Sequence, residues 1–174
     1  MVRSAGKSIA TAAQNHPTAF FGLGLAGMLS LLFFDPLFLT RTFIGRDLGA
    51  FFFPIEKAVH AAWSQGRLPL LIPEISFGRL LAANPNTGAF YPVRIVMALL
   101  PFSSAFKFFP VFHLWLAGVG AFLLARHFGI SRWGSAVAGL GFALSGPALS
   151  DVMYPNILPG LAFMPFVILT AGRL

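Results

Sequence analysis

Four long apolar windows, nearly free of charged residues, follow one another along the chain. A helix needs about 20 apolar residues to cross the hydrocarbon core of a bilayer, so each window predicts a membrane-spanning helix. The predicted spans are residues 19–39, 105–128, 133–149 and 157–171. The pattern therefore predicts an all-α membrane protein of about four transmembrane helices, with one long external loop at about residues 40–104.

Basic residues at the ends of these windows predict the orientation of the helices. Arg126, Arg132 and Arg173 all fall on the side of the N-terminus, where residues 1–18 form a polar, basic leader. Because basic residues of short loops stay in the cytoplasm, we expect a cytoplasmic leader followed by a transmembrane module at residues 19–174. The first window ends without the small residues of a cleavage site, which predicts an uncleaved anchor.

The composition supports a membrane environment. The chain is 57% hydrophobic and 10% charged, with a mean hydropathy of +0.80, so it has too few polar side chains to coat a soluble protein. It contains no cysteine, which excludes disulfides and thiolate metal sites. We expect membrane lipid as a partner and no nucleic acid.

The predicted external loop carries more basic than acidic residues. Because long loops cross the membrane largely regardless of their charge, this excess does not change the predicted orientation. A basic loop at a membrane surface favours an anionic ligand such as a lipid phosphate. Between residues 40 and 107 the basic residues are Arg41, Arg46, Lys57, Arg67, Arg79, Arg94 and Lys107, and the acidic residues are Asp47, Glu56 and Glu74.

Two helices are predicted within the external loop. From Pro54 to about Gln65, apolar residues recur at helical spacing opposite a polar face that includes Glu56, which is typical of a helix lying in the membrane interface. A second interfacial or re-entrant helix is predicted at 93–100. The proline- and glycine-rich stretch from 67 to 92 shows neither helical nor strand periodicity and predicts an ordered loop.

Several small residues recur at a spacing that favours close helix packing. Gly22, Gly24 and Gly27 match a dinucleotide-binding pattern by letter, but they lie inside a predicted membrane helix, so we interpret them as packing positions. Ser135 with Gly139, and Gly141 with Ser145, repeat this spacing in the third window, where we also expect packing.

Two acidic residues are candidates for chemistry on the external side. Asp47 follows the first span, where a carboxylate can serve as a general base or a metal ligand; a solvated turn residue is the alternative. Asp151 follows the third span and is therefore expected to face the same compartment. Asp35 lies near the outer end of the first span, where a functional and a solvated role stay equally open. His113 lies inside the second span, and we expect it to bond a neighbouring helix rather than a metal.

A series of short landmarks extends from the first external loop to the end of the chain. In the loop they are Gly45-Arg46-Asp47, Phe53-Pro54, Gly66 to Leu70, Phe77-Gly78 and Ala83 to Pro92. Beyond the loop they are His113 to Gly118, Phe128 to Arg132, Phe142 to Gly146 and Tyr154-Pro155-Asn156. Their order, over roughly residues 20–174, resembles the N-terminal part of YfhO-like membrane proteins of the GT-C glycosyltransferase superfamily.

This resemblance implies an enzyme of the bacterial cytoplasmic membrane that passes a sugar from a polyprenyl-phosphate carrier to an acceptor on the outer face. Asp47 matches the family's acid that activates the acceptor hydroxyl, and Asp151 is a second catalytic candidate. Arg46, Arg67 and Arg79 are implied to bind the lipid-linked sugar phosphate, because guanidinium groups suit phosphate oxygens. No cofactor is indicated, and a divalent metal stays an open alternative.

Two alternatives to a complete enzyme stay open. Members of the family are several times longer, so we expect this chain to be an N-terminal portion, and Tyr154 stands where the family has a histidine. A non-catalytic membrane subunit that packs against other subunits of a larger complex is the first alternative. A lipid-binding or transport component is the second, although transport usually requires more spans or an oligomer.

Overall fold

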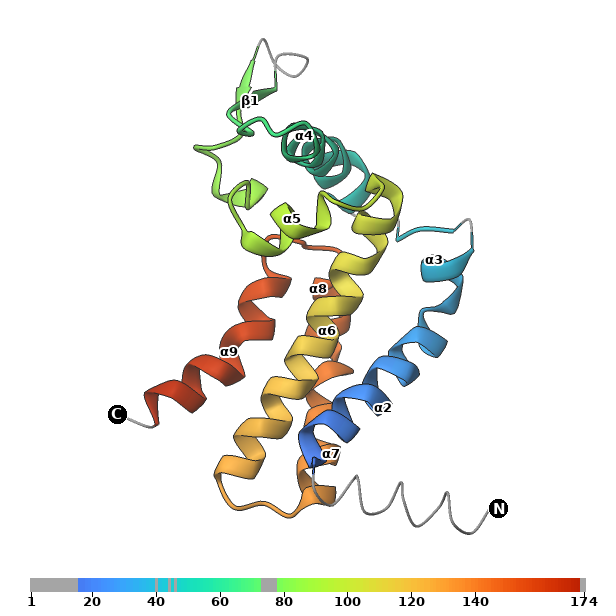
Figure 1. The fold of residues 1–174 in the computed structure, drawn as a ribbon, viewed down its shortest axis with the longest axis vertical. Coiled ribbons are helices and arrows are strands. Elements are labelled where there is room, and N and C mark those ends of the chain that lie inside the picture. The colour runs from blue at the N-terminus through green and yellow to red at the C-terminus, as the bar shows by residue number, and fades with distance from the viewer. Residues whose placement is uncertain (1–15, 40, 44, 46, 73–77, 173–174) are drawn as a thin grey trace. The chain divides into compact units, whose positions relative to one another are not determined.

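A computed structural model describes residues 16–39, 41–43, 45, 47–72 and 78–172 of the chain. Within these residues the protein is mostly helical, which confirms the predicted all-α class (Figure 1). The elements from the N-terminus to the loop are α2 (Pro17–Leu32), α3 (Phe34–Phe38), a π-helical turn η1 (Leu48–Phe52), α4 (Phe53–Ser64), β1 (Leu71–Ile72), β2 (Arg79–Leu80) and a 3-10 turn η2 (Pro85–Thr87). They are followed by α5 (Pro92–Met97), α6 (Phe102–His127), α7 (Arg132–Ala143), α8 (Gly146–Asp151) and α9 (Leu158–Ala171).

The chain divides into two compact units. The first unit comprises residues 1–34, 113–149 and 160–174, and the second comprises residues 35–112 and 150–159. Helix α6 contributes its first part to the second unit and its remainder to the first. The second unit therefore joins most of the predicted external loop to a short segment that lies far along the chain.

Helix α6 is long and apolar enough to cross a membrane, and among the described residues it is the one helix that meets this criterion. Its 26 residues rise roughly 39 Å, more than the hydrocarbon core of about 30 Å. The window at 105–128 thus forms a helix of spanning length. Helices α2 and α9, over the first and fourth windows, have 16 and 14 residues, so these spans stay predictions.

The third window is not the single helix that was predicted for 133–149. Helix α7 ends at Ala143, and the separate helix α8 begins at Gly146. Pro147 explains the break, because it has no N–H to bond a carbonyl of α7, whereas proline is tolerated in the first turn of the new helix. The Ser145 hydroxyl accepts a hydrogen bond from the Ala148 amide at 3.3 Å, which starts the new helix.

Small residues bring the helices of the first unit into close contact. A Cβ on Gly139 of α7 would lie 2.7 Å from the Gly118 carbonyl oxygen of α6 and 2.6 Å from the Phe21 ring of α2. The Trp115 indole donates a hydrogen bond to the Gly22 carbonyl at 2.8 Å. The predicted packing role is confirmed for Gly139, whereas an added Cβ on Gly24, Gly27 or Gly141 would meet no atom within 4 Å.

Helix α4 organises the second unit. The predicted helix from Pro54 to about Gln65 is confirmed as Phe53–Ser64. Its residues Ile55 and Val59 are 1% exposed and pack in a cluster with Ile72, Leu81 and Ala89. The buried part of the apolar stripe therefore packs on residues of the loop itself, and the position of the helix in the membrane interface stays a prediction.

The stretch from 67 to 92 contains more regular structure than the sequence predicted. Strands β1 and β2 pair antiparallel, with Leu71 opposite Leu80 and Ile72 opposite Arg79. The turn η2 begins where the Asn84 side chain accepts a hydrogen bond from the Asn86 amide. Strands of two residues are too short for a detectable alternation, which explains why the sequence predicted an ordered loop without this strand pair.

Candidate functional site

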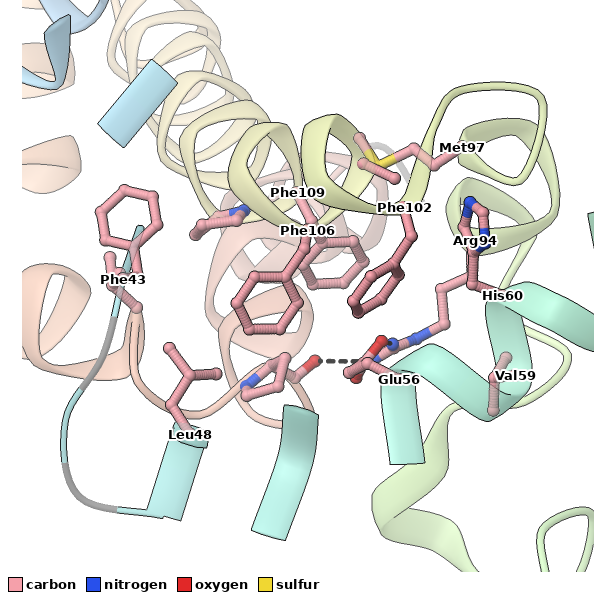
Figure 2. A pocket seen from close by; sticks show the side chains of 14 residues that line it. Phe43, Leu48, Glu56, Val59, His60, Arg94, Met97, Phe102, Phe106 and Phe109 are labelled. Atoms are coloured by element: carbon pink, nitrogen blue, oxygen red, sulfur yellow. Dashed lines mark hydrogen bonds and ion pairs between the residues drawn. The ribbon is translucent and has the colours of Figure 1, made fainter. Parts of the chain in front are cut away.

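A buried ion pair lies at the centre of the second unit. The Arg94 guanidinium of α5 meets the Glu56 carboxylate of α4, and their side chains are only 5% and 12% exposed. Figure 2 shows the Arg94 side chain extending toward Glu56, beside the aromatic rings that α6 contributes. The two buried charges stabilise each other, because an unpaired buried charge is energetically costly.

Three further contacts hold the Arg94 side chain. Its Nη2 donates a hydrogen bond to the Pro155 carbonyl oxygen at 3.3 Å, and its guanidinium carbon lies 4.7 Å from the centre of the Phe109 ring. The latter is a cation–π distance. A Cβ on Gly88 would lie 3.0 Å from Arg94 Nε, and Gly88 has a φ of +51°, so both space and backbone favour glycine there. Arg94 thus ties together four segments of the chain.

The guanidinium keeps its charge at neutral pH. Burial lowers the pKa of Arg94 to about 9, because the charged form loses its hydration. That pKa is still well above 7. The Glu56 carboxylate lies against the guanidinium and offsets its buried charge.

A small cavity adjoins the ion pair. The room for water-sized molecules is about 40 Å³, whereas all the empty space between the lining side chains, including the open mouth, is about 540 Å³. A water molecule needs at least 10–15 Å³ on the first measure, so about 40 Å³ admits a few waters and no sugar ring. The walls are Phe43, Leu48, Glu56, Val59, His60, Arg94, Met97, Phe102, Ala105, Phe106, Phe109, Pro110, Val152 and Pro155.

The polar wall of this cavity has unused hydrogen-bonding capacity. Within the described part of the chain, Glu56 Oε1, Arg94 Nε and Arg94 Nη1 are buried and make no hydrogen bond, although Nη1 contributes to the ion pair. Buried polar atoms nearly always have a partner. His60, on the same wall, is engaged through Nε2 with the Leu100 carbonyl oxygen at 2.9 Å.

Two of the landmark segments come together in this unit. The Asn156 side-chain amide donates a hydrogen bond to Oδ1 of Asn86 at 3.0 Å. The preceding residue, Pro155, accepts the hydrogen bond from Arg94 through its carbonyl oxygen, and Gly88 lies close to the same guanidinium. The contacts join the loop motif at 83–92 to the motif at 154–156.

The two predicted catalytic acids lie on segments that flank the cavity. Asp47 is exposed at the start of η1, and Asp151 ends α8, partly buried, with its backbone carbonyl accepting a hydrogen bond from the Tyr154 amide. Their neighbours Leu48 and Val152 line the cavity, whereas neither acid does. A Cβ on Gly45 would lie 3.5 Å from the Met153 sulfur, so the segments are adjacent.

Of the three predicted phosphate-binding arginines, only Arg67 has a described side chain. It is exposed and donates a hydrogen bond to the Gln65 side-chain oxygen. The whole of Arg46 and the side chain of Arg79 lie outside the described residues. Asp35 forms an exposed ion pair with Arg41 at 3.3 Å, and His113 is fully buried.

Sequence reasoning missed Glu56 and Arg94 as partners. It assigned Glu56 to a polar helix face and counted Arg94 only among the loop cations. One signal was present, because Arg94 is the sole charge in the apolar run from Val93 to Leu100, where a charge needs a partner.

Neither a metal-binding cluster among the described residues nor a known relative indicates the chemistry of this site. Among the described residues, no three His, Asp or Glu side chains gather where they could bind a metal ion. No protein-family model matches the chain, and neither the curated proteins nor the solved structures include a significant match.

Proposed function

We propose that this chain is the N-terminal membrane module of a glycosyltransferase of the GT-C type, similar to YfhO-like proteins. It transfers a sugar from a polyprenyl-phosphate carrier to an acceptor on the outer face of a bacterial cytoplasmic membrane. The observation that carries the proposal is the contact between the motif at 83–92 and the motif at 154–156, through Asn86 and Asn156. The resemblance rests on the order of these motifs, and their contact supports the proposal that they belong to one site.

The proposed topology has four spans with the leader in the cytoplasm. The loop at about 40–104 and Asp151 then face the outer side, where the acceptor is found. The spanning length and apolar character of α6 support this arrangement.

In the proposed reaction Asp47 acts as the general base. Its carboxylate takes the proton of the acceptor hydroxyl while the hydroxyl oxygen bonds to the anomeric carbon of the sugar. The bond from that carbon to the phosphate oxygen breaks, and polyprenyl phosphate leaves with the electron pair. Arg46, Arg67 and Arg79 stabilise the negative charge of the leaving phosphate, and Asp151 provides a second acid on the same side. The solvent exposure of Asp47 suits a base that must meet an incoming acceptor.

The test begins with reading the coding sequence beyond the codon for Leu174 and expressing the whole encoded protein in membranes. Transfer from a polyprenyl-phosphate sugar is then compared between the unaltered protein and Asp47→Asn. Loss of a general base lowers the rate by roughly 10²–10⁴-fold. Asp35→Asn is the matched control, because Asp35 is another exposed acid of the second unit, and it should retain transfer. Equal rates for Asp47→Asn and Asp35→Asn would exclude Asp47 as the base.

A non-catalytic membrane subunit is the second candidate function. The small volume of the cavity favours it, because about 40 Å³ holds no sugar ring. The tight contact between Gly118 and Gly139 shows that these helices pack through small residues, as subunit helices do. Purification of the chain in a stable complex with other membrane subunits, without transfer activity, would establish this alternative.

A further inference from the structure

The cavity beside the ion pair combines an apolar wall with one polar end. Glu56 and Arg94 form that end, and the aromatic rings of Phe102, Phe106 and Phe109 cover much of the remainder. We propose that this cavity binds the hydroxyl end of an uncharged, linear alcohol. The proposal goes beyond sugar transfer, because such binding needs no sugar donor.

The charges of the polar end select a hydroxyl group. A carboxylate or phosphate would be attracted by Arg94 but repelled by Glu56, and an ammonium group would meet the opposite conflict. A hydroxyl group both donates and accepts hydrogen bonds. It can donate to Glu56 Oε1 and accept from Arg94 Nε, two buried atoms that make no hydrogen bond with the described residues.

The shape of the cavity selects a narrow chain. The room for water-sized molecules, about 40 Å³, admits a hydroxyl group and the first carbon atoms, and the cavity is partly open to its surroundings. An unbranched chain in this cavity would lie against apolar lining residues such as Phe106, Met97 and Val152. Binding is favoured because the chain displaces water from these apolar walls.

A photoreactive diazirine derivative of 1-octanol tests the proposal on the full chain in lipid nanodiscs at neutral pH. Labelled residues are located by mass spectrometry of peptides, and unlabelled 1-octanol, octanoate and octylamine serve as competitors. We expect labels on lining residues of α4 and α6, and competition by octanol at a concentration at least tenfold lower than by either ion. Octanoate or octylamine competing as well as octanol would overturn the hydroxyl assignment without any variant being needed.

Two variants localise the binding. Ala105→Phe fills the cavity from α6, where Ala105 is buried, and should abolish the labelling. The double variant Glu56→Met with Arg94→Met keeps the site apolar and should weaken competition by octanol about tenfold, the equivalent of one hydrogen bond of about 1.4 kcal/mol. Gly141→Phe is the control, because a Cβ there meets no atom within 4 Å.

Photolabelling of protein without any sugar donor tests this proposal independently of the transfer reaction. Labelling that is spread over the helices and unchanged by Ala105→Phe would show that the cavity holds water only. That result would leave the role of Asp47 in sugar transfer untouched, since Asp47 does not line the cavity.

Discussion

Asn156 donates a hydrogen bond from Nδ2 to Oδ1 of Asn86 over 3.0 Å, although 70 positions separate them in the chain. The bond fixes the short segment after α8 against the 3-10 turn of the loop. Arg94 makes a second connection to the same segment through the Pro155 carbonyl. The second unit is therefore held together by polar contacts between distant residues as well as by the apolar cluster around α4.

The bond between the two asparagines should appear as an energetic coupling. In a double-mutant cycle of Asn86→Ala and Asn156→Ala, the two effects on the free energy of unfolding should be non-additive by about 0.5–1.5 kcal/mol. Reversible unfolding in mixed micelles provides the measurement. Ser64→Ala combined with Asn156→Ala should be additive, because Ser64 bonds only within the end of its own helix. Additivity in both cycles would show that the bond does not stabilise the fold.

Removing one partner of the buried ion pair should lower the free energy of unfolding more than removing both partners. Arg94→Met leaves the Glu56 carboxylate buried without its partner, so it should lower the free energy of unfolding by about 3–5 kcal/mol. The double variant with Glu56→Met should recover most of this loss, because two apolar side chains leave no buried charge.

The exposed pair of Arg41 and Asp35 supplies the matched control for this experiment. The side chain of Arg41 is 80% exposed, so Arg41→Met should change the free energy of unfolding by about 0–1 kcal/mol. A double variant as unstable as Arg94→Met alone would show that the contacts of Arg94 with Pro155 and Phe109, rather than charge pairing, dominate.

Two glycines of α7 should respond oppositely to the same substitution. Gly139→Ala places a Cβ 2.7 Å from the Gly118 carbonyl oxygen, and this overpacking should destabilise the protein by about 1–3 kcal/mol. Gly141→Ala, two positions further on, meets open space and should be neutral or stabilising, since alanine favours helix. Thermal unfolding of both variants in one detergent makes the comparison, and equal losses would contradict the close contact of α6 and α7.

The phenol of Tyr91 should ionise at a higher pH in the folded protein than in the unfolded protein. Burial raises the pKa of its phenol from about 10 to about 12, since the charged phenolate loses hydration. Because the folded-state pKa is the higher one, the stability that Tyr91 contributes is complete below pH 10 and is lost as the pH rises toward 12. Ultraviolet titration of phenolate should show a late component that vanishes in Tyr91→Phe. Identical titrations of folded and denatured protein would contradict this.

The predicted path through the membrane can be tested by cysteine labelling, because the chain has no cysteine of its own. Ser64→Cys, at the end of α4, should react with an impermeant maleimide in intact cells. Phe128→Cys, in the exposed turn after α6, should react only after the membrane is permeabilised, since the proposed topology has this turn on the cytoplasmic side. Labelling of both from the same side would exclude the four-span topology.

Local patterns in the sequence predicted the helices well. The helix predicted from Pro54 to about Gln65 forms at Phe53–Ser64, and the window at 105–128 forms the long helix Phe102–His127. The break after Ala143 was not predicted, although Pro147 marks it, because the residues at 133–149 form one continuous apolar window. Such features depend on residues within one or two helical turns, so they are visible in a linear sequence.

Tertiary structure alone decided which distant residues meet. The sequence determined that the chain is helical and apolar, and it identified Asp47 and Asp151 as candidate acids on the same side. It did not indicate that Glu56 pairs with Arg94, because each is one of several charges in the loop. That pairing requires α4, α5 and the segment at 154–156 to close around one guanidinium. Long-range closure depends on the packing of whole elements, which no local spacing of residues encodes.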